Sequence, residues 1–285
     1  MATFTLASLH RFEFAKHVIF LQADLQRPVL LANVGNDSLC AIDIDRMLVH
    51  PIDLKPLVDE FLIYSWTMDL DGRCSLLASS DPVDFGIALD HQTWSPLRFR
   101  LPEGVDLLAA ACWTQPRFAA MDSTGKVWNA VNAELVELPQ DPAEERRNAV
   151  YARLFARSSV FSFDGENGLA CLAAGEGDLG VAAPPGWDVK VMGAMTGLET
   201  AAAHHRGHMF VSYADRIDVL TGGRRATALS PEAGRKFFRV AIGPWRGGTY
   251  LAALSGAIAD RRTPFWIDVY DLRVGASPTG SPTTR

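Results

Sequence analysis

Residues 118–128 have the sequence FAAMDSTGKVW, in which two apolar stretches flank the polar segment Asp122-Ser123-Thr124-Gly125. Asp, Ser and Gly favour tight turns, and a short apolar run on each side of such a turn is typical of two antiparallel strands. The segment therefore predicts a β-hairpin.

The same arrangement occurs six times along the chain. In each copy, two mostly apolar residues and a small residue precede a polar turn and a second apolar stretch; the small residues are Ala32, Ala78, Ala120, Ala173, Ser212 and Ala252. Successive small residues are separated by 39 to 53 positions. This spacing is close to the roughly 40 to 50 residues of one four-stranded propeller blade. In the period and placement of its turns, the sequence resembles β-propeller repeat proteins over residues 3–272.

A second apolar run precedes each copy, and three of these runs are rich in small residues: Ala109–Ala111, Ala201–Ala203 and Val240–Ile242. In a propeller the innermost strand of each blade lies close to the central axis, where large side chains from several blades do not fit. Alanine also favours helices, but turn residues flank each run within a few positions. We therefore expect these runs to be innermost strands, each followed by the strand that carries the repeated small residue.

The resemblance implies an all-β fold, about a six-bladed β-propeller of four-stranded antiparallel blades, as a single domain over residues 1–274. The segment Thr3–Leu9 is expected to add the fourth strand of the last blade and so close the ring. Residues 275–285 are rich in Pro, Gly, Ser and Thr, which predicts a disordered tail. Asp141, Pro142 and Glu144 have the order of a helix N-terminus, which predicts a short helical insertion at 141–150. The Gly-His and Trp-Asp signatures of WD repeats and the double glycine of kelch repeats are missing, so no family's binding residues can be transferred.

Composition excludes several classes of function. The chain has 285 residues, of which 48% are hydrophobic and 21% charged, as in folded proteins. Its net charge of −6 lacks the basic excess that nucleic acid or an anionic membrane surface would require. No apolar run approaches the roughly 18 residues of a membrane span, and the four cysteines lie far apart within apolar runs. We therefore expect a cytoplasmic protein with no nucleic-acid or membrane partner.

Catalytic and metal-binding motifs are missing from the sequence. There is no Gly-x-Ser-x-Gly elbow and no phosphate-binding glycine loop. The cluster His204, His205 and His208 has no carboxylate within it to orient a ligand, so neither a metal nor a cofactor is predicted. Carboxylates scattered among the turns leave open a propeller-fold hydrolase, of lactonase or glycosidase type, with an acid pair near the axis.

Charge is distributed differently over the two expected faces of the ring. Turns between second and third strands are acidic, and they supply the predicted partner-binding residues Asp37, Asp81, Asp84, Asp122, Asp178 and Asp215. Loops between first and second strands would lie on the opposite face and supply a second set of candidates, namely Arg27, Arg73, Trp113, Arg117, Arg206, Trp245 and Arg246. The alternative is that each aspartate only stabilises its own turn and that each tryptophan packs between blades.

Together these observations favour a non-catalytic protein–protein interaction module. Its expected partner is a protein with a basic patch, bound through the acidic loop face. A scaffold and a bacterial immunity-type inhibitor of a toxin are two forms of such a module. The hydrolase remains the alternative.

Overall fold

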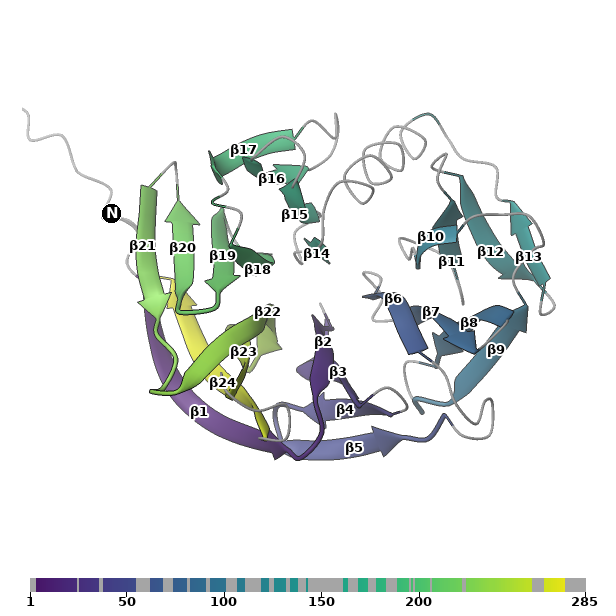
Figure 1. Ribbon diagram of the computed structural model, residues 1–285, viewed down its shortest axis with the longest axis horizontal. Helices are drawn as coiled ribbons and strands as arrows, with labels where there is room; N and C mark the ends of the chain where they lie inside the picture. Colours follow the sequence, from purple (N-terminus) through teal and green to yellow (C-terminus); the bar gives the residue numbers. More distant parts are fainter. Residues whose placement is uncertain are drawn as a thin grey trace, which may run out of the picture.

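The computed structural model describes residues 4–24, 26–35, 38–54, 62–68, 74–80, 83–90, 93–100, 107–110, 119–122, 126–131, 134–137, 142, 161–163, 169–173, 178–182, 189–194, 196, 198–205, 207–221, 224–257 and 264–274. Within these ranges the chain forms six four-stranded sheets with antiparallel pairing. The sheets are arranged in a ring, with one strand of each sheet near the centre and one at the periphery (Figure 1). Inside the described ranges, no helix is long and apolar enough to cross a membrane.

Three sheets are formed by the first half of the chain. The first contains β2 (Val18–Ala23), β3 (Val29–Val34), β4 (Leu39–Asp43) and β5 (Leu48–Ile52). The second contains β6 (Leu62–Met68), β7 (Cys74–Ser80), β8 (Val83–Leu89) and β9 (Pro96–Arg100). The third contains β10 (Leu107–Ala110), β11 (Ala119–Asp122), β12 (Val127–Val131) and β13 (Glu134–Glu137).

The second half forms two sheets of the same order and most of a third. One contains β14 (Phe161–Phe163), β15 (Leu169–Ala173), β16 (Asp178–Ala182) and β17 (Val189–Ala194). The next contains β18 (Glu199–His205), β19 (His208–Tyr213), β20 (Ile217–Thr221) and β21 (Arg224–Leu229). The last strands are β22 (Arg235–Trp245), β23 (Gly248–Ala257) and β24 (Phe265–Val274).

The fourth strand of this last sheet comes from the start of the chain. Strand β1 (Phe4–Phe14) pairs antiparallel with β24, from Phe4 opposite Val274 to Phe14 opposite Phe265. We call the sheet of β22, β23, β24 and β1 the closing sheet. The segment Thr3–Leu9 was expected in this place, and the strand extends five residues further, to Phe14.

The two inner strands of a sheet are more buried than its outermost strand, which explains the sequence pattern. Strand β19 is buried along its whole length, whereas the outermost strands β5 and β21 are mostly exposed. An inner strand is covered on both faces by neighbouring sheets, so its alternate residues enter different cores. In β18, Ala201 and Ala203 pack toward the closing sheet, whereas Ala202 packs in the core that includes residues of β16 and β17. This two-sided burial requires continuous apolar runs rather than alternation of apolar and polar residues.

The predicted strand roles are confirmed where the structure describes them. Each of the six repeated small residues lies in the second strand of its sheet, and the alanine-rich runs lie in the first strands β10, β18 and β22, with Ala111 outside the described residues. The helix predicted at 141–150 lies outside the described residues except for Pro142, and so does the tail at 275–285.

Five of the six first strands share an irregularity that the sequence did not indicate. In β2, β6, β10, β18 and β22, the register against the second strand shifts by one residue. In β18 the shift lies between Glu199 and Ala201, and in β22 it lies between Phe237 and Arg239. These are β-bulges, in which the extra residue leaves the regular ladder and side chains are redirected.

Candidate functional site

Four of the six predicted acidic residues have no described side chain. Asp37 and Asp81 lie outside the described residues. Asp84 is the second residue of β8 and Asp178 is the first residue of β16, so both belong to strands rather than to the turns in which the sequence analysis placed them. The difference arises because the pairing of β7 with β8 begins at Val83, directly after the turn.

Asp122 is buried and stabilises its own hairpin. Its Oδ1 accepts a hydrogen bond from the Lys126 backbone N–H at 3.1 Å, and its Oδ2 accepts one from Trp128 Nε1 at 3.0 Å. The Asp122 backbone N–H also donates to the Lys126 carbonyl oxygen at 3.0 Å. Asp122 therefore closes the turn between β11 and β12, and the prediction that it presents its carboxylate to a partner is corrected.

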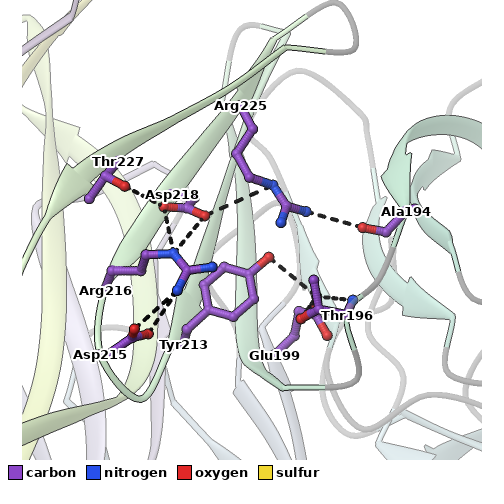
Figure 2. A network of polar contacts seen from close by, with 9 residues as sticks. All are labelled: Ala194, Thr196, Glu199, Tyr213, Asp215, Arg216, Asp218, Arg225 and Thr227. Atoms are coloured by element: carbon purple, nitrogen blue, oxygen red, sulfur yellow. Dashed lines mark hydrogen bonds and ion pairs between the residues drawn. The ribbon is translucent and has the colours of Figure 1, made fainter.

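Asp215 is exposed in the turn between β19 and β20, as predicted. Its side chain is 74% exposed and pairs with Arg216, whose Nη1 lies 3.0 Å from Oδ1 and 3.1 Å from Oδ2. Arg216 Nε also donates to both oxygens of Asp218, whose side chain is buried. The carboxylate of Asp215 thus reaches solvent while an arginine holds it in place (Figure 2).

A network around Tyr213 connects this turn to the preceding sheet. The guanidinium carbons of Arg216 and Arg225 lie 4.4 Å and 5.6 Å from the centre of the Tyr213 ring. Arg225 Nη2 donates to the carbonyl oxygen of Ala194, in β17, at 3.1 Å (Figure 2). The Tyr213 hydroxyl donates to Glu199 Oε1 at 3.2 Å. Burial raises the pKa of Tyr213 to about 12, and the neighbouring Glu199 carboxylate adds to this effect.

Among the second set of candidates, Arg73, Trp113, Arg117 and Arg206 lie outside the described residues. Arg27 is described, and its Nε donates to Oδ2 of the fully buried Asp24 at 2.6 Å. Its guanidinium carbon lies 5.1 Å from the centre of the Trp94 ring, which belongs to the turn between β8 and β9 of the next sheet. Arg27 therefore neutralises a buried carboxylate and contacts a neighbouring sheet.

Trp245 and Arg246 make a similar contact from the closing sheet to the first sheet. Arg246 and Gly247 form a two-residue turn with φ of 46° and 74°, the positive values that a type I′ hairpin turn requires. Arg246 Nε lies 3.6 Å from Asp45 Oδ1, in the turn between β4 and β5. Trp245 is half-buried against the core between the two sheets. Trp245 thus has the contacts that the packing alternative expects.

The arginine contacts follow one rule that sequence reasoning missed. Arg27 and Arg246 each lie between the first and second strands of one sheet, and each contacts the turn between the third and fourth strands of the next sheet. Each of these turns also contains a non-glycine residue in the left-handed region, Met47 at φ 53° and Trp94 at φ 57°. The only sequence signal was the recurrence of arginine in the loops.

The histidines form contacts within and between sheets. His205 Nε2 lies 3.1 Å from Thr249 Oγ1 of β23, and His208 Nδ1 is hydrogen-bonded to Thr221 Oγ1 of β20. Burial lowers the pKa of His208, and the charge of His204 lowers it further. Considering only residues that the structure describes, no group of three or more His, Cys, Asp or Glu side chains is placed to hold a metal ion.

Solved structures of similar architecture extend over almost the whole chain. The PQQ-bound aldose sugar dehydrogenase from Streptomyces coelicolor aligns with a TM-score of 0.50 and 11% identity, covering 96% of this chain and 99% of that one. The chain has the β-propeller fold. The β-propeller domain of Swd1 from Myceliophteria thermophila aligns with a TM-score of 0.47 and 13% identity, covering 94% of this chain and 99% of that one. A streptogramin B lyase aligns with a TM-score of 0.46 and 11% identity, covering 96% and 98%.

No protein-family model matches the chain, and no curated protein sequence matches it. At identities of 11 to 13%, the likeness to the solved structures concerns the fold alone. Their site residues are therefore not transferred to this chain.

Proposed function

We propose that the chain is a six-bladed β-propeller that binds a protein partner without catalysing a reaction. In this proposal the partner presents a basic surface to the residues in or beside the turns between second and third strands. We call Asp37, Asp81, Asp84, Asp178 and Asp215, which lie in or directly beside these turns, the acidic turn residues. Asp122 is left out of this set because its carboxylate is buried.

The observation that carries the proposal is the common strand order of the sheets. In a propeller every sheet has its first strand innermost and the same direction along the axis, so equivalent turns meet at one face. Like charges from several sheets then add. Their summed field attracts an oppositely charged partner, even though one exposed ion pair contributes less than about 1 kcal/mol.

The described residues favour this face over the opposite one. Asp215 is 74% exposed in its turn, and solvent reaches its carboxylate. On the opposite face, Arg27 is held by the buried Asp24 and Arg246 lies beside Asp45 of the neighbouring sheet. These two arginines have roles in packing, which makes them weaker candidates for binding a partner.

The experiment compares two double variants with opposite charge changes. The variant with Asp178→Lys and Asp215→Lys reverses the charge of two acidic turn residues. The variant with Arg46→Glu and Arg246→Glu reverses the charge of two exposed arginines on the other face. Each purified chain is used as bait in a lysate of cells that express it, and captured proteins are quantified by mass spectrometry. For the captured partner, association rates are then measured against ionic strength.

We expect the aspartate variant to associate more slowly and with a weaker salt dependence than wild type, and we expect the arginine variant to associate as wild type does. Loss of binding in the arginine variant alone would contradict the proposal and move the binding site to the other face. Turnover of a lactone or glycoside by the purified chain, with no captured protein, would favour the hydrolase.

A further inference from the structure

Arg239 lies in a strand whose other central residues are apolar. It belongs to β22, the first strand of the closing sheet, and is followed by the buried residues Val240, Ala241 and Ile242. Strands β22 and β18 are near the centre of the ring (Figure 1). Arg239 is half-buried, so an innermost strand carries a partly buried guanidinium group.

Two bulges position this guanidinium. Arg239 Nη1 donates a hydrogen bond to the carbonyl oxygen of Thr200 at 2.7 Å and another to that of Phe238 at 3.0 Å. Thr200 is the extra residue of the bulge in β18, and Phe238 is the extra residue of the bulge in β22. Carbonyl groups at bulges are outside the regular ladder and can accept such bonds. The contact therefore depends on the irregularity of both first strands.

The charge of Arg239 has no counterion within the described part of the chain. Its hydrogen bonds there are the two from Nη1 to neutral carbonyl groups, so Nε and Nη2 have no partner among those residues. Four other arginines in or beside the strands of the closing sheet each pair with a carboxylate: Arg11 with Asp268 and Glu232, Arg235 with Glu232, Arg246 with Asp45, and Arg273 with Asp271. Arg235 is half-buried like Arg239, so among the described residues Arg239 differs from this set in its lack of an acidic partner.

Burial of an uncompensated charge is unfavourable, and it lowers the pKa of Arg239. A guanidinium that has bound only two carbonyl oxygens keeps Nε and Nη2 available as parallel donors. These donors match the two oxygens of a carboxylate or phosphate group. An oxyanion would therefore supply an opposite charge and two acceptors for these donors.

We propose that Arg239 anchors an oxyanion-binding site on the inner side of the ring, between β18 and β22, which takes the carboxylate or phosphate group of a small molecule. The position between two first strands, rather than in an exposed loop, favours a small ligand over a protein side chain. This site contains none of the acidic turn residues and does not depend on the proposed protein-binding function.

Isothermal titration calorimetry of the full chain tests the site with two probes, inorganic phosphate and succinate, each compared with sodium chloride at equal ionic strength. Wild type is expected to bind at least one probe saturably. Arg239→Gln is expected to bind that probe at least about 10-fold more weakly, because both the charge and the paired donors are lost. The probe that binds distinguishes a phosphate site from a carboxylate site.

Two further variants complete the test. Arg273→Gln removes an exposed, paired arginine from the same sheet and is expected to bind as wild type does. Arg239→Lys keeps the charge without the planar fork, and is expected to bind more weakly than wild type. The proposal is overturned if wild type binds neither probe, if Arg239→Gln binds the probe as wild type does, or if Arg273→Gln loses as much binding as Arg239→Gln. If Arg239→Gln does not fold, normal binding by Arg239→Lys overturns it.

Discussion

Replacing Phe12 by alanine tests the contact through which the start of the chain stabilises the whole ring. Phe12 lies in β1, opposite Ile267 of β24, and is only 6% exposed. It belongs to a core cluster that also contains Leu21, Leu30 and Ile42 of the first sheet. The phenyl ring is therefore packed between the closing sheet and the first sheet, and its removal affects the interface between the two ends of the chain.

The expected loss follows from this burial. Truncating a buried phenylalanine to alanine costs about 3 to 5 kcal/mol, because the transfer energy is lost and a cavity remains. For a chain of this size, each kcal/mol lowers Tm by about 2 to 4 °C, so Tm should fall by roughly 6 to 20 °C. Thermal unfolding followed by calorimetry and by circular dichroism measures the change.

Three comparisons separate ring closure from a general effect of mutation. Leu48→Ala, at a position 51% exposed in β5, should change stability by no more than about 0.5 kcal/mol. Deletion of residues 1–9 removes the β1 residues opposite Tyr270 to Val274 and should lower Tm. Deletion of residues 276–285 should leave Tm nearly unchanged. A Phe12→Ala variant that melts within about 2 °C of wild type would refute the reasoning.

Other substitutions test single contacts. Gly243→Ala should destabilise the chain by about 1 to 3 kcal/mol in urea unfolding, since the added Cβ would lie 2.7 Å from the ring of the fully buried Tyr250; an unchanged midpoint would contradict this packing. Burial raises the pKa of Cys40 to about 12, so iodoacetamide at pH 8 should modify Cys40 only after unfolding, as measured by mass spectrometry of its peptide. For Glu199, burial opposes the charged form, but hydrogen bonds from Thr196 and Tyr213 outweigh it and lower the pKa below its ordinary value of 4.5. A carboxylate with a lowered pKa stabilises the folded state above its ordinary pKa, so the stability advantage of wild type over Glu199→Gln should be full at pH 7 and decline as pH falls below about 4.5.

Local sequence was sufficient for the strand pattern because turns and apolar runs are short-range features. Asp122, Ser123, Thr124 and Gly125 predict a turn without reference to the rest of the chain. Repetition of such turns every 39 to 53 residues then limits the fold to a few repeat architectures. Small residues at Ala201–Ala203 indicated the innermost strand, because packing near an axis constrains side-chain size in any chain of this architecture.

The roles of individual charged residues were decided only by contacts between distant parts of the chain. Arg11 pairs with Glu232, and the Tyr250 hydroxyl donates to the Val29 carbonyl oxygen at 3.0 Å, although more than 200 positions separate each pair. No local pattern distinguishes an arginine that holds a neighbouring sheet, such as Arg27, from one that is free to bind a partner.

Arg239 is the clearest case of a residue whose role local sequence does not indicate. Its surroundings depend on bulges at Thr200 and Phe238, and a bulge is a property of how two strands pair rather than of either strand alone. The sequence by itself determined which segments are strands and which turns connect them. Tertiary structure determined which side chains meet, because burial and charge compensation depend on neighbours that only the assembled ring supplies.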